Sequence, residues 1–147
     1  MKMFENQFYA NEPQGKRKSL IIKEILGRTK GQLITKGFKI MDIGCGNGHL
    51  TAFLAYLGAS AVGVDFDKES IKYAKIMHRE GNLEFYQGNA FDVAVDLKVA
   101  GKLDVVTAFE VPEHISQLED FFKNIHSILK TDGRFIMSVP NGYSIEE

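Results

Sequence analysis

The chain of 147 residues has little cysteine, little proline and almost no net charge, and it has no tryptophan. Its single cysteine, Cys45, excludes an intrachain disulfide and agrees with a reducing cytoplasm, where we expect the protein. The net charge of −1 provides no overall field that would attract nucleic acid or an anionic membrane. The N-terminus shows no basic segment followed by an apolar one, so no secretory signal is predicted.

Long uncharged segments are also scarce. Residues 43–64 lack Asp, Glu, Lys and Arg over a length that could cross a membrane. Glycines and polar side chains interrupt this segment, which therefore fits a strand end, a helix and the next strand better than a membrane span. With 44% hydrophobic and 25% charged residues, the composition is that of an ordinary folded domain, and we expect a single domain over residues 1–147.

Apolar spacing predicts that helices and strands alternate along the chain. The predicted strands are 37–43, 61–65, 83–87, 103–109 and 134–139. The predicted helices are 14–28 in an N-terminal lead-in of residues 1–36, about 49–58, 67–80, a short one within 89–100, and 118–129 preceded by a capping box of Ser116 and Glu119. This alternation predicts an α/β, Rossmann-like, doubly wound fold with a mostly parallel sheet of about five strands and helices on both faces.

The most informative motif is Asp42-Ile43-Gly44-Cys45-Gly46-Asn47-Gly48, which lies between the first of these strands and a helix. Glycine at every second position lets the backbone turn tightly and lets a ligand lie against it. In parallel sheets, ligands bind at the carboxyl ends of the strands, where this loop is predicted to lie. The unit therefore predicts a nucleotide-type pocket.

The spacing of the glycines limits which nucleotide fits. A dinucleotide loop requires a third glycine at the position of His49, and a P-loop requires a Gly-Lys-Ser/Thr sequence that does not follow here. The loop therefore need not hold a phosphate. An acid at its start, Asp42, suits a ligand that carries a positive charge or an ammonium group.

This motif resembles the first motif of class I S-adenosylmethionine-dependent methyltransferases, and the resemblance extends over about residues 37–142. It implies that the glycine loop passes under the methionine part of the cofactor, and that Asp65 accepts hydrogen bonds from both ribose hydroxyls. Phe66 would flank the adenine, and Asn89, where the family usually has Asp, would accept from the adenine amino group through its carbonyl oxygen. The implied S-adenosyl-L-methionine site comprises Asp42, Gly44, Cys45, Gly46, Gly48, Asp65, Phe66, Asn89, Ala90 and Glu110.

Each of these residues also has a simpler interpretation. Asp65 alone could cap the turn that follows it, Asn89 alone could be a turn residue, and Cys45 is expected to be a small loop residue rather than a nucleophile. The joint pattern of a glycine loop, an acid after the second strand and a Gly-Asn-Ala turn after the third favours the cofactor site.

A second group of polar side chains follows the fourth strand. Glu110, Glu113 and His114 are spaced so that all three could converge on one side of a helical turn that begins near Pro112. His114 could then take a proton from a nucleophile, or the three could hold a divalent metal such as Mg²⁺ that polarises a hydroxyl. A capped helix start with solvated acids is the alternative.

Within the family, this Glu-x-x-Glu-His stretch is similar to the ubiquinone-biosynthesis O-methyltransferase branch, whose members use these residues around a divalent metal. Small-RNA 2′-O-methyltransferases carry a similar stretch, whereas the Asp/Asn-Pro-Pro-aromatic motif of DNA amino-group methyltransferases is absent. The resemblance implies O-methylation of a small molecule, without nucleic acid as a partner. His49 is expected in a helix-cap region, and His78 and His126 on exposed helix faces.

The resemblance also extends to the segments 130–134 and 138–142. Family members usually continue with two more strands, which this chain lacks, so its fifth strand is expected at a sheet edge. A dimer contact or a partner chain could cover that edge, and the chain could be a truncation. Two rivals to a methyltransferase stay open: a cofactor-binding but non-catalytic fragment or subunit, and an NAD-dependent oxidoreductase.

Overall fold

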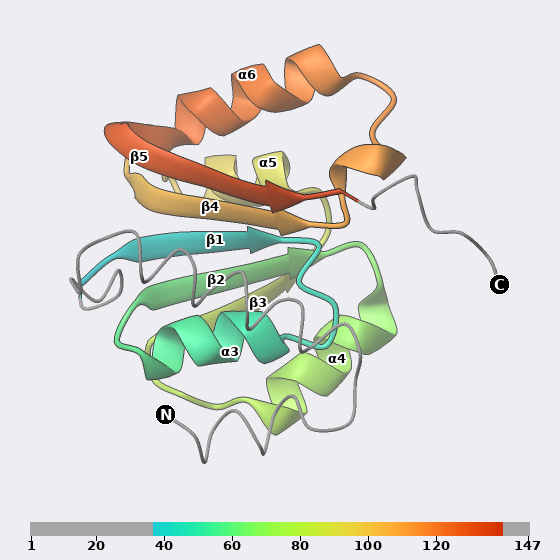
Figure 1. Cartoon of the computed structure of the whole chain (residues 1–147). Helices are drawn as coiled ribbons and strands as arrows, with labels where there is room; N and C mark the ends of the chain where they lie inside the picture. Colours follow the sequence, from blue (N-terminus) through green and yellow to red (C-terminus); the bar gives the residue numbers. More distant parts are fainter. Residues whose placement is uncertain (1–36, 140–147) are drawn as a thin grey trace, which may run out of the picture.

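The computed structural model describes residues 37–139, which form a five-stranded sheet flanked by helices (Figure 1). The strands are β1 (Lys39–Ile43), β2 (Ser60–Asp65), β3 (Leu83–Gln87), β4 (Leu103–Phe109) and β5 (Leu129–Ser138). The helices are α3 (His49–Tyr56), α4 (Lys68–Met77), α5 (Ala90–Asp96), α6 (Leu118–Ile128) and the 3₁₀ turn η1 (Pro112–His114). The predicted helix 14–28 lies outside the described residues.

The strand order is β3-β2-β1-β4-β5, and every neighbouring pair is parallel. The order reverses between β1 and β4, and the crevice beside such a reversal is where parallel α/β sheets bind ligands. The loops that follow β1 and β4 both begin at this point. The predicted Rossmann-like α/β fold is therefore confirmed, and it places the glycine loop at the expected ligand-binding edge.

Hydrophobic side chains of the central strands pack against helices on both faces of the sheet. Ile40 of β1 packs in one cluster with apolar side chains of α3, whereas its neighbour Met41 packs in another with those of α5 and α6. Successive side chains of a strand point to opposite faces, so β1 is buried on both. Figure 1 shows α3 and α4 below the sheet and α5 and α6 above it.

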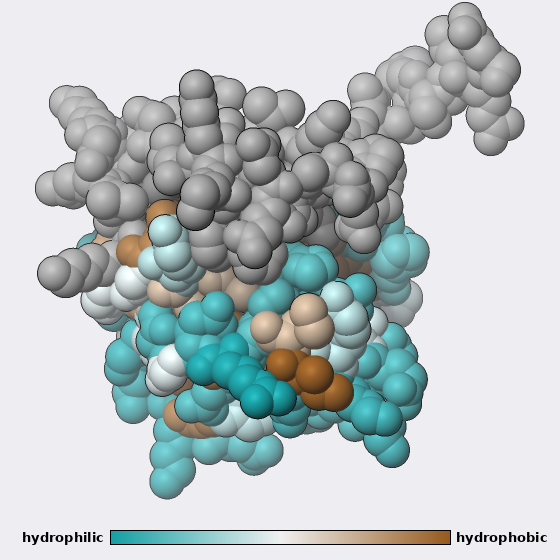
Figure 2. Space-filling model, turned by 90° about the horizontal axis from the view of Figure 1, so that it is seen from below, coloured by the Kyte–Doolittle hydropathy of each residue, from teal (hydrophilic) through white to brown (hydrophobic). Residues whose placement is uncertain are grey.

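Helix α4 is shorter than predicted. Its Ile71 and Ala74 are buried, but the helix ends at Met77 rather than near Glu80, and Met77 is 57% exposed. Figure 2, which views the molecule from the side of α3 and α4, shows mostly hydrophilic atoms with small hydrophobic groups among them. Among residues 37–139, no helix is both long and apolar enough to cross a bilayer.

Helix α6 begins without the predicted capping box. Its N-cap is Gln117 rather than Ser116, and no side chain caps it. The Glu119 carboxylate instead lies 2.7 Å from Lys123 Nζ, one helical turn further on. Phe121, Ile125 and Ile128 form the buried stripe of α6, whereas Phe122 is 40% exposed.

Strand β5 begins earlier than predicted. It starts at Leu129, directly after α6, and its pairing with β4 shifts between the pairs Leu103–Leu129 and Val105–Arg134. The regular pairing runs from Arg134 to Ser138, which matches the predicted strand. Among the described strands, β5 lies at one end of the sheet order, as expected.

Candidate cofactor site

The glycine loop is fastened to the end of the neighbouring strand β2. The backbone N–H groups of Gly44 and Cys45 donate to the carbonyl oxygen of Val64, at 2.8 and 3.1 Å. The N–H of Gly46 donates to Asp65 Oδ2 at 2.8 Å. The loop after β1 and the acid at the end of β2 are therefore hydrogen-bonded into one unit.

Gly44 and Gly46 of the loop both have a backbone conformation that favours glycine, but their surroundings differ. Gly44 has φ +70°, and a Cβ atom there would lie 2.4 Å from Cγ2 of Val111, so the loop touches the segment that follows β4. Gly46 has φ +52°, but a Cβ atom there would meet no heavy atom of residues 37–139 within 4 Å. The space beside Gly46 is therefore open to a ligand that lies against the loop.

Asp42 lies at the root of the loop and is buried. Its Oδ2 accepts a hydrogen bond from Thr51 Oγ1 at 2.8 Å, and its Oδ1 accepts one from Thr107 Oγ1 at 2.7 Å. The carboxylate thus joins β1 to α3 and β4. This arrangement gives Asp42 a role in positioning the loop, beside the predicted attraction for a cationic ligand.

Asp65 combines two backbone contacts with access to solvent. Its Oδ2 accepts from Gly46 and its Oδ1 accepts from the N–H of Asp67 at 2.8 Å. An ionised carboxylate has about four acceptor sites, so acceptor capacity remains for the hydroxyl groups of a ligand. The side chain of the next residue, Phe66, is 69% exposed and is available to a flat ring.

Asn89 caps a helix, which fits the simpler interpretation of this residue as part of a turn. It is the N-cap of α5, and its Oδ1 accepts from the N–H of Phe91 at 2.8 Å. A carbonyl oxygen has a second lone pair, so this cap leaves room for one further donor. Cys45 is buried in a cluster with Phe85 and the inward side of α4, which fits a small loop residue.

The segment after β4 carries a strained residue next to the glycine loop. Glu110 is half-buried and has φ +56°, and its N–H donates to the carbonyl oxygen of Ser138. Such conformations cost roughly 1 kcal/mol or more in a residue other than glycine, and they gather at functional sites. Pro112 opens the 3₁₀ turn as predicted, and Glu113 and His114 on this turn are exposed.

The predicted metal ligands do not gather. Within the described range 37–139, no three His, Cys, Asp or Glu side chains form a group that could hold a metal ion. The set Glu110, Glu113 and His114 therefore does not fit a metal in this arrangement, and we derive no metal-dependent step from it.

The structure reveals one contact of the glycine loop that sequence reasoning missed. His78 was expected on an exposed helix face, but only 6% of it is exposed, and its Nε2 lies 3.2 Å from the carbonyl oxygen of Asn47. Burial lowers the pKa of the imidazole below its usual value, and the nearby His49 lowers it further. The sequence predicts that this helix continues past residue 77. In such a longer helix, His78 would lie on the exposed face. By contrast, His126 is exposed as expected.

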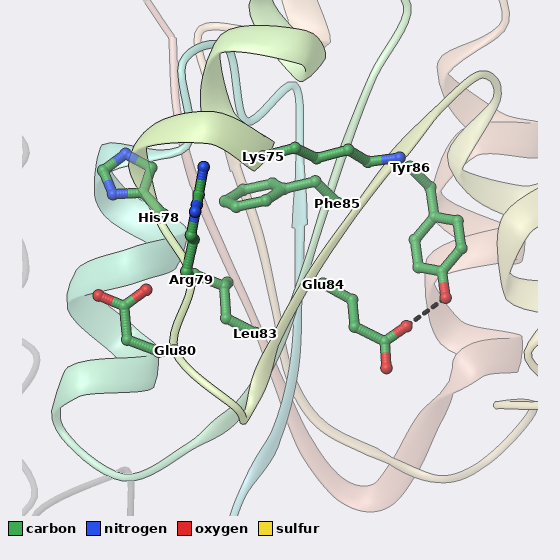
Figure 3. A pocket seen from close by; sticks show the side chains of 8 residues that line it. All are labelled: Lys75, His78, Arg79, Glu80, Leu83, Glu84, Phe85 and Tyr86. Carbon is green, nitrogen blue, oxygen red and sulfur yellow. Dashed lines mark hydrogen bonds between the residues drawn. The ribbon is translucent and has the colours of Figure 1, made fainter.

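His78 also lines a pocket of about 380 Å³ between the C-terminal end of α4 and β3. Figure 3 shows His78 and Glu80 at one end of this pocket and Glu84 and Tyr86 at the other. None of the predicted cofactor residues lines it. The pocket is therefore separate from the predicted cofactor residues, which lie at or after the carboxyl ends of β1, β2, β3 and β4.

Fold and loop together define a Rossmann-like domain with a nucleotide-type cofactor site. Residues 34–146 match the family described as methyltransferase domain. The ubiquinone biosynthesis O-methyltransferase of Pelagibacter ubique is 33% identical over 125 residues, which are 84% of this chain and 50% of that protein. The PH0226 protein of Pyrococcus horikoshii superposes with a TM-score of 0.70 at 28% identity, over 86% of this chain and 58% of that one.

A protein of Listeria monocytogenes assigned as an S-adenosylmethionine-dependent methyltransferase superposes with a TM-score of 0.65 at 26% identity, over 71% of this chain and 48% of that one. The chain belongs to the methyltransferase-domain family, which confirms the resemblance seen in its motifs. It spans about half the length of the Pelagibacter relative. An NAD-dependent oxidoreductase gains no support from these comparisons.

Replacing Asp42 by Asn is expected to lower the free energy of unfolding by about 2 kcal/mol, measured by urea denaturation. The variant loses the charged acceptor for Thr51 or Thr107, and hydrogen bonds to charged groups contribute roughly 1.5–3 kcal/mol. The control Thr51→Ser keeps its hydroxyl and is expected to lose less than about 1 kcal/mol. If Asp42→Asn weakens cofactor binding at full stability, the carboxylate acts on the ligand and not on the threonines.

Proposed function

We propose that this chain is the cofactor-binding part of an S-adenosylmethionine-dependent methyltransferase that methylates an oxygen of a small molecule. The observation that carries the proposal is the joined unit of Gly46 and Asp65, with open space beside the glycine. The name of the Pelagibacter relative supports oxygen as the methyl acceptor.

The residues present fit this cofactor. The open side of Gly46 would take the methionine part, the Asp65 carboxylate retains acceptor sites for the ribose hydroxyls, and the exposed Phe66 ring would flank the adenine. When bound, S-adenosylmethionine supplies an electrophilic methyl group on its sulfonium. Positioning against such an electrophile provides a large part of the rate, so the rigid attachment of the loop to β2 matters.

Methyl transfer to a hydroxyl also requires a group that removes the proton of the acceptor hydroxyl. We assign this role to His114. The ring is exposed on the turn η1, where a substrate could reach it. An imidazole nitrogen within hydrogen-bond reach of the hydroxyl can accept this proton as a general base. Glu110 and Glu113 carry negative charge in the same segment and would stabilise the imidazolium that forms.

Two measurements test this function. Calorimetric titration of the chain with S-adenosylhomocysteine is expected to show binding. Transfer of a labelled methyl group from S-adenosylmethionine to catechol or hydroquinone is expected to follow. Binding without transfer to any hydroxyl probe would favour the non-catalytic rival, a fragment or subunit that needs a partner chain. Absence of binding would contradict both.

Replacing His114 by Ala is expected to lower turnover by about 100-fold, because a positioned general base contributes roughly 10²–10⁴-fold. The affinity for S-adenosylhomocysteine is expected to stay within about twofold, since the ring lies outside the residues assigned to the cofactor. The exposed His126→Ala on α6 is the matched control, with unchanged turnover. The assigned step uses no metal, so activity is expected to survive a strong chelator. A large loss of cofactor affinity in His114→Ala would show that the role is misassigned.

A further inference from the structure

The Asn47–Gly48 peptide, in the middle of the cofactor loop, is contacted from both sides. The N–H of Gly48 donates to the carbonyl oxygen of Cys45 at 3.0 Å. The carbonyl oxygen of Asn47 faces the other way, toward Nε2 of His78 at 3.2 Å. Because a peptide bond is planar, fixing the carbonyl direction also fixes the direction of the N–H.

The His78 ring must act as the donor in this contact. A carbonyl oxygen can only accept, so Nε2 carries the hydrogen. The lowered pKa of the ring indicates that it is neutral at neutral pH, which assigns the Nε2–H tautomer. His78 lies 31 residues from Asn47 and reaches the loop from the end of α4, where its own N–H donates to Ala74.

Ring packing holds the imidazole in place beneath the loop. Its ring centroid lies 5.2 Å from that of His49, edge to face, and 6.1 Å from that of Phe85. The Phe85 ring in turn lies directly under Gly48, where a Cβ atom would approach it to 2.5 Å. The loop therefore rests on a layer of rings contributed by α3, β3 and the end of α4.

We propose that His78 is a positioning residue of the cofactor loop, whose Nε2–H fixes the Asn47–Gly48 peptide at the start of α3. The proposal rests on the assignment of residues 44–48 to the cofactor. His78 acts through the loop backbone, at the carbonyl group of Asn47, the residue that follows Gly46. Removing the hydrogen bond therefore loosens the loop without removing any group assigned to the ligand.

The test compares two substitutions of His78 in the full chain. His78→Phe keeps a ring but has no donor, and it is expected to weaken S-adenosylhomocysteine binding by about 10-fold, which corresponds to one buried hydrogen bond. His78→Gln carries a donor at about the reach of Nε2 and is expected to stay within about threefold. The control His126→Phe, at an exposed site on α6, is expected to bind normally.

Three outcomes would overturn the proposal. His78→Phe could bind as well as the unsubstituted chain, or the Phe and Gln variants could weaken binding equally, which would assign the effect to packing. Nitrogen-15 NMR of the unsubstituted chain could show the Nδ1–H tautomer, and this measurement decides the question even if His78→Phe does not fold. Absence of binding by the unsubstituted chain would instead contradict the cofactor assignment itself, so the two failures are distinguishable.

Discussion

The variant Asp65→Ala is expected to bind S-adenosylhomocysteine about 100-fold more weakly than the unsubstituted chain, measured by calorimetric titration. The carboxylate is assigned to the ribose hydroxyls, and hydrogen bonds to a charged acceptor contribute roughly 1.5–3 kcal/mol each. A loss of about 3 kcal/mol corresponds to about 100-fold in affinity. The substitution also removes the acceptor that holds the N–H of Gly46, so the loop loses an anchor together with the ligand contact.

Two further variants separate these effects. Asp65→Asn keeps one carbonyl oxygen but no charge, and it is expected to lose about 10-fold in affinity. Asp132→Ala removes an exposed acid from the start of β5, at the opposite end of a parallel strand, and is expected to bind normally. If Asp65→Ala binds within about threefold of the unsubstituted chain, the carboxylate does not contact the ligand and only holds the N–H groups of Gly46 and Asp67.

The strands and the glycine loop could be predicted because their signals are local. Apolar runs bounded by glycine and acids place β2, β3 and β4 within a residue of their observed bounds. The prediction of the loop required only the spacing of its glycines and the acid before them. All three of these glycines, Gly44, Gly46 and Gly48, have the positive φ values that such a loop needs.

The contacts beneath the loop could not be predicted, because they join residues far apart in the sequence. If α4 continued to Glu80, His78 would lie on an exposed face of the helix. The neighbouring residues in the sequence do not indicate that α4 ends at Met77. The bonds from Thr51 and Thr107 to Asp42 likewise depend on which strands are neighbours. The predicted capping box does not form, because Glu119 binds Lys123 and the N-cap is Gln117 rather than Ser116.

The residues that we assign to the cofactor lie in the described part of the chain. They are the glycine loop and Asp65, and the turn η1, which carries His114, follows β4. The chain spans about half the length of the Pelagibacter relative. Binding measurements therefore test this chain more directly than turnover does.

Replacing Gly48 by Ala is expected to lower the free energy of unfolding by about 3 kcal/mol, measured by urea denaturation. Gly48 has φ +78°, which costs a residue with a Cβ atom roughly 1–2 kcal/mol. The added methyl group would also lie 2.5 Å from the buried Phe85 ring and 2.9 Å from Cβ of Ala74, and overpacking of this kind typically costs roughly 1–3 kcal/mol. Both effects act at Gly48, which is the N-cap of α3, so we expect the added methyl group to displace the loop and the helix together.

Two other glycines with positive φ separate the strain from the collision. Gly101→Ala, at φ +62° with open space around it and away from the loop, measures the backbone cost alone and is expected to lose about 1 kcal/mol. Gly46→Ala, at φ +52° and also open, is expected to be about as stable as Gly101→Ala but to bind S-adenosylhomocysteine at least 10-fold more weakly, because its methyl group enters the space assigned to the ligand. If Gly48→Ala loses no more stability than Gly101→Ala, the Phe85 ring moves aside at no cost, and the loop does not rest on a rigid layer. If Gly46→Ala binds normally, the cofactor does not lie against the loop at that point.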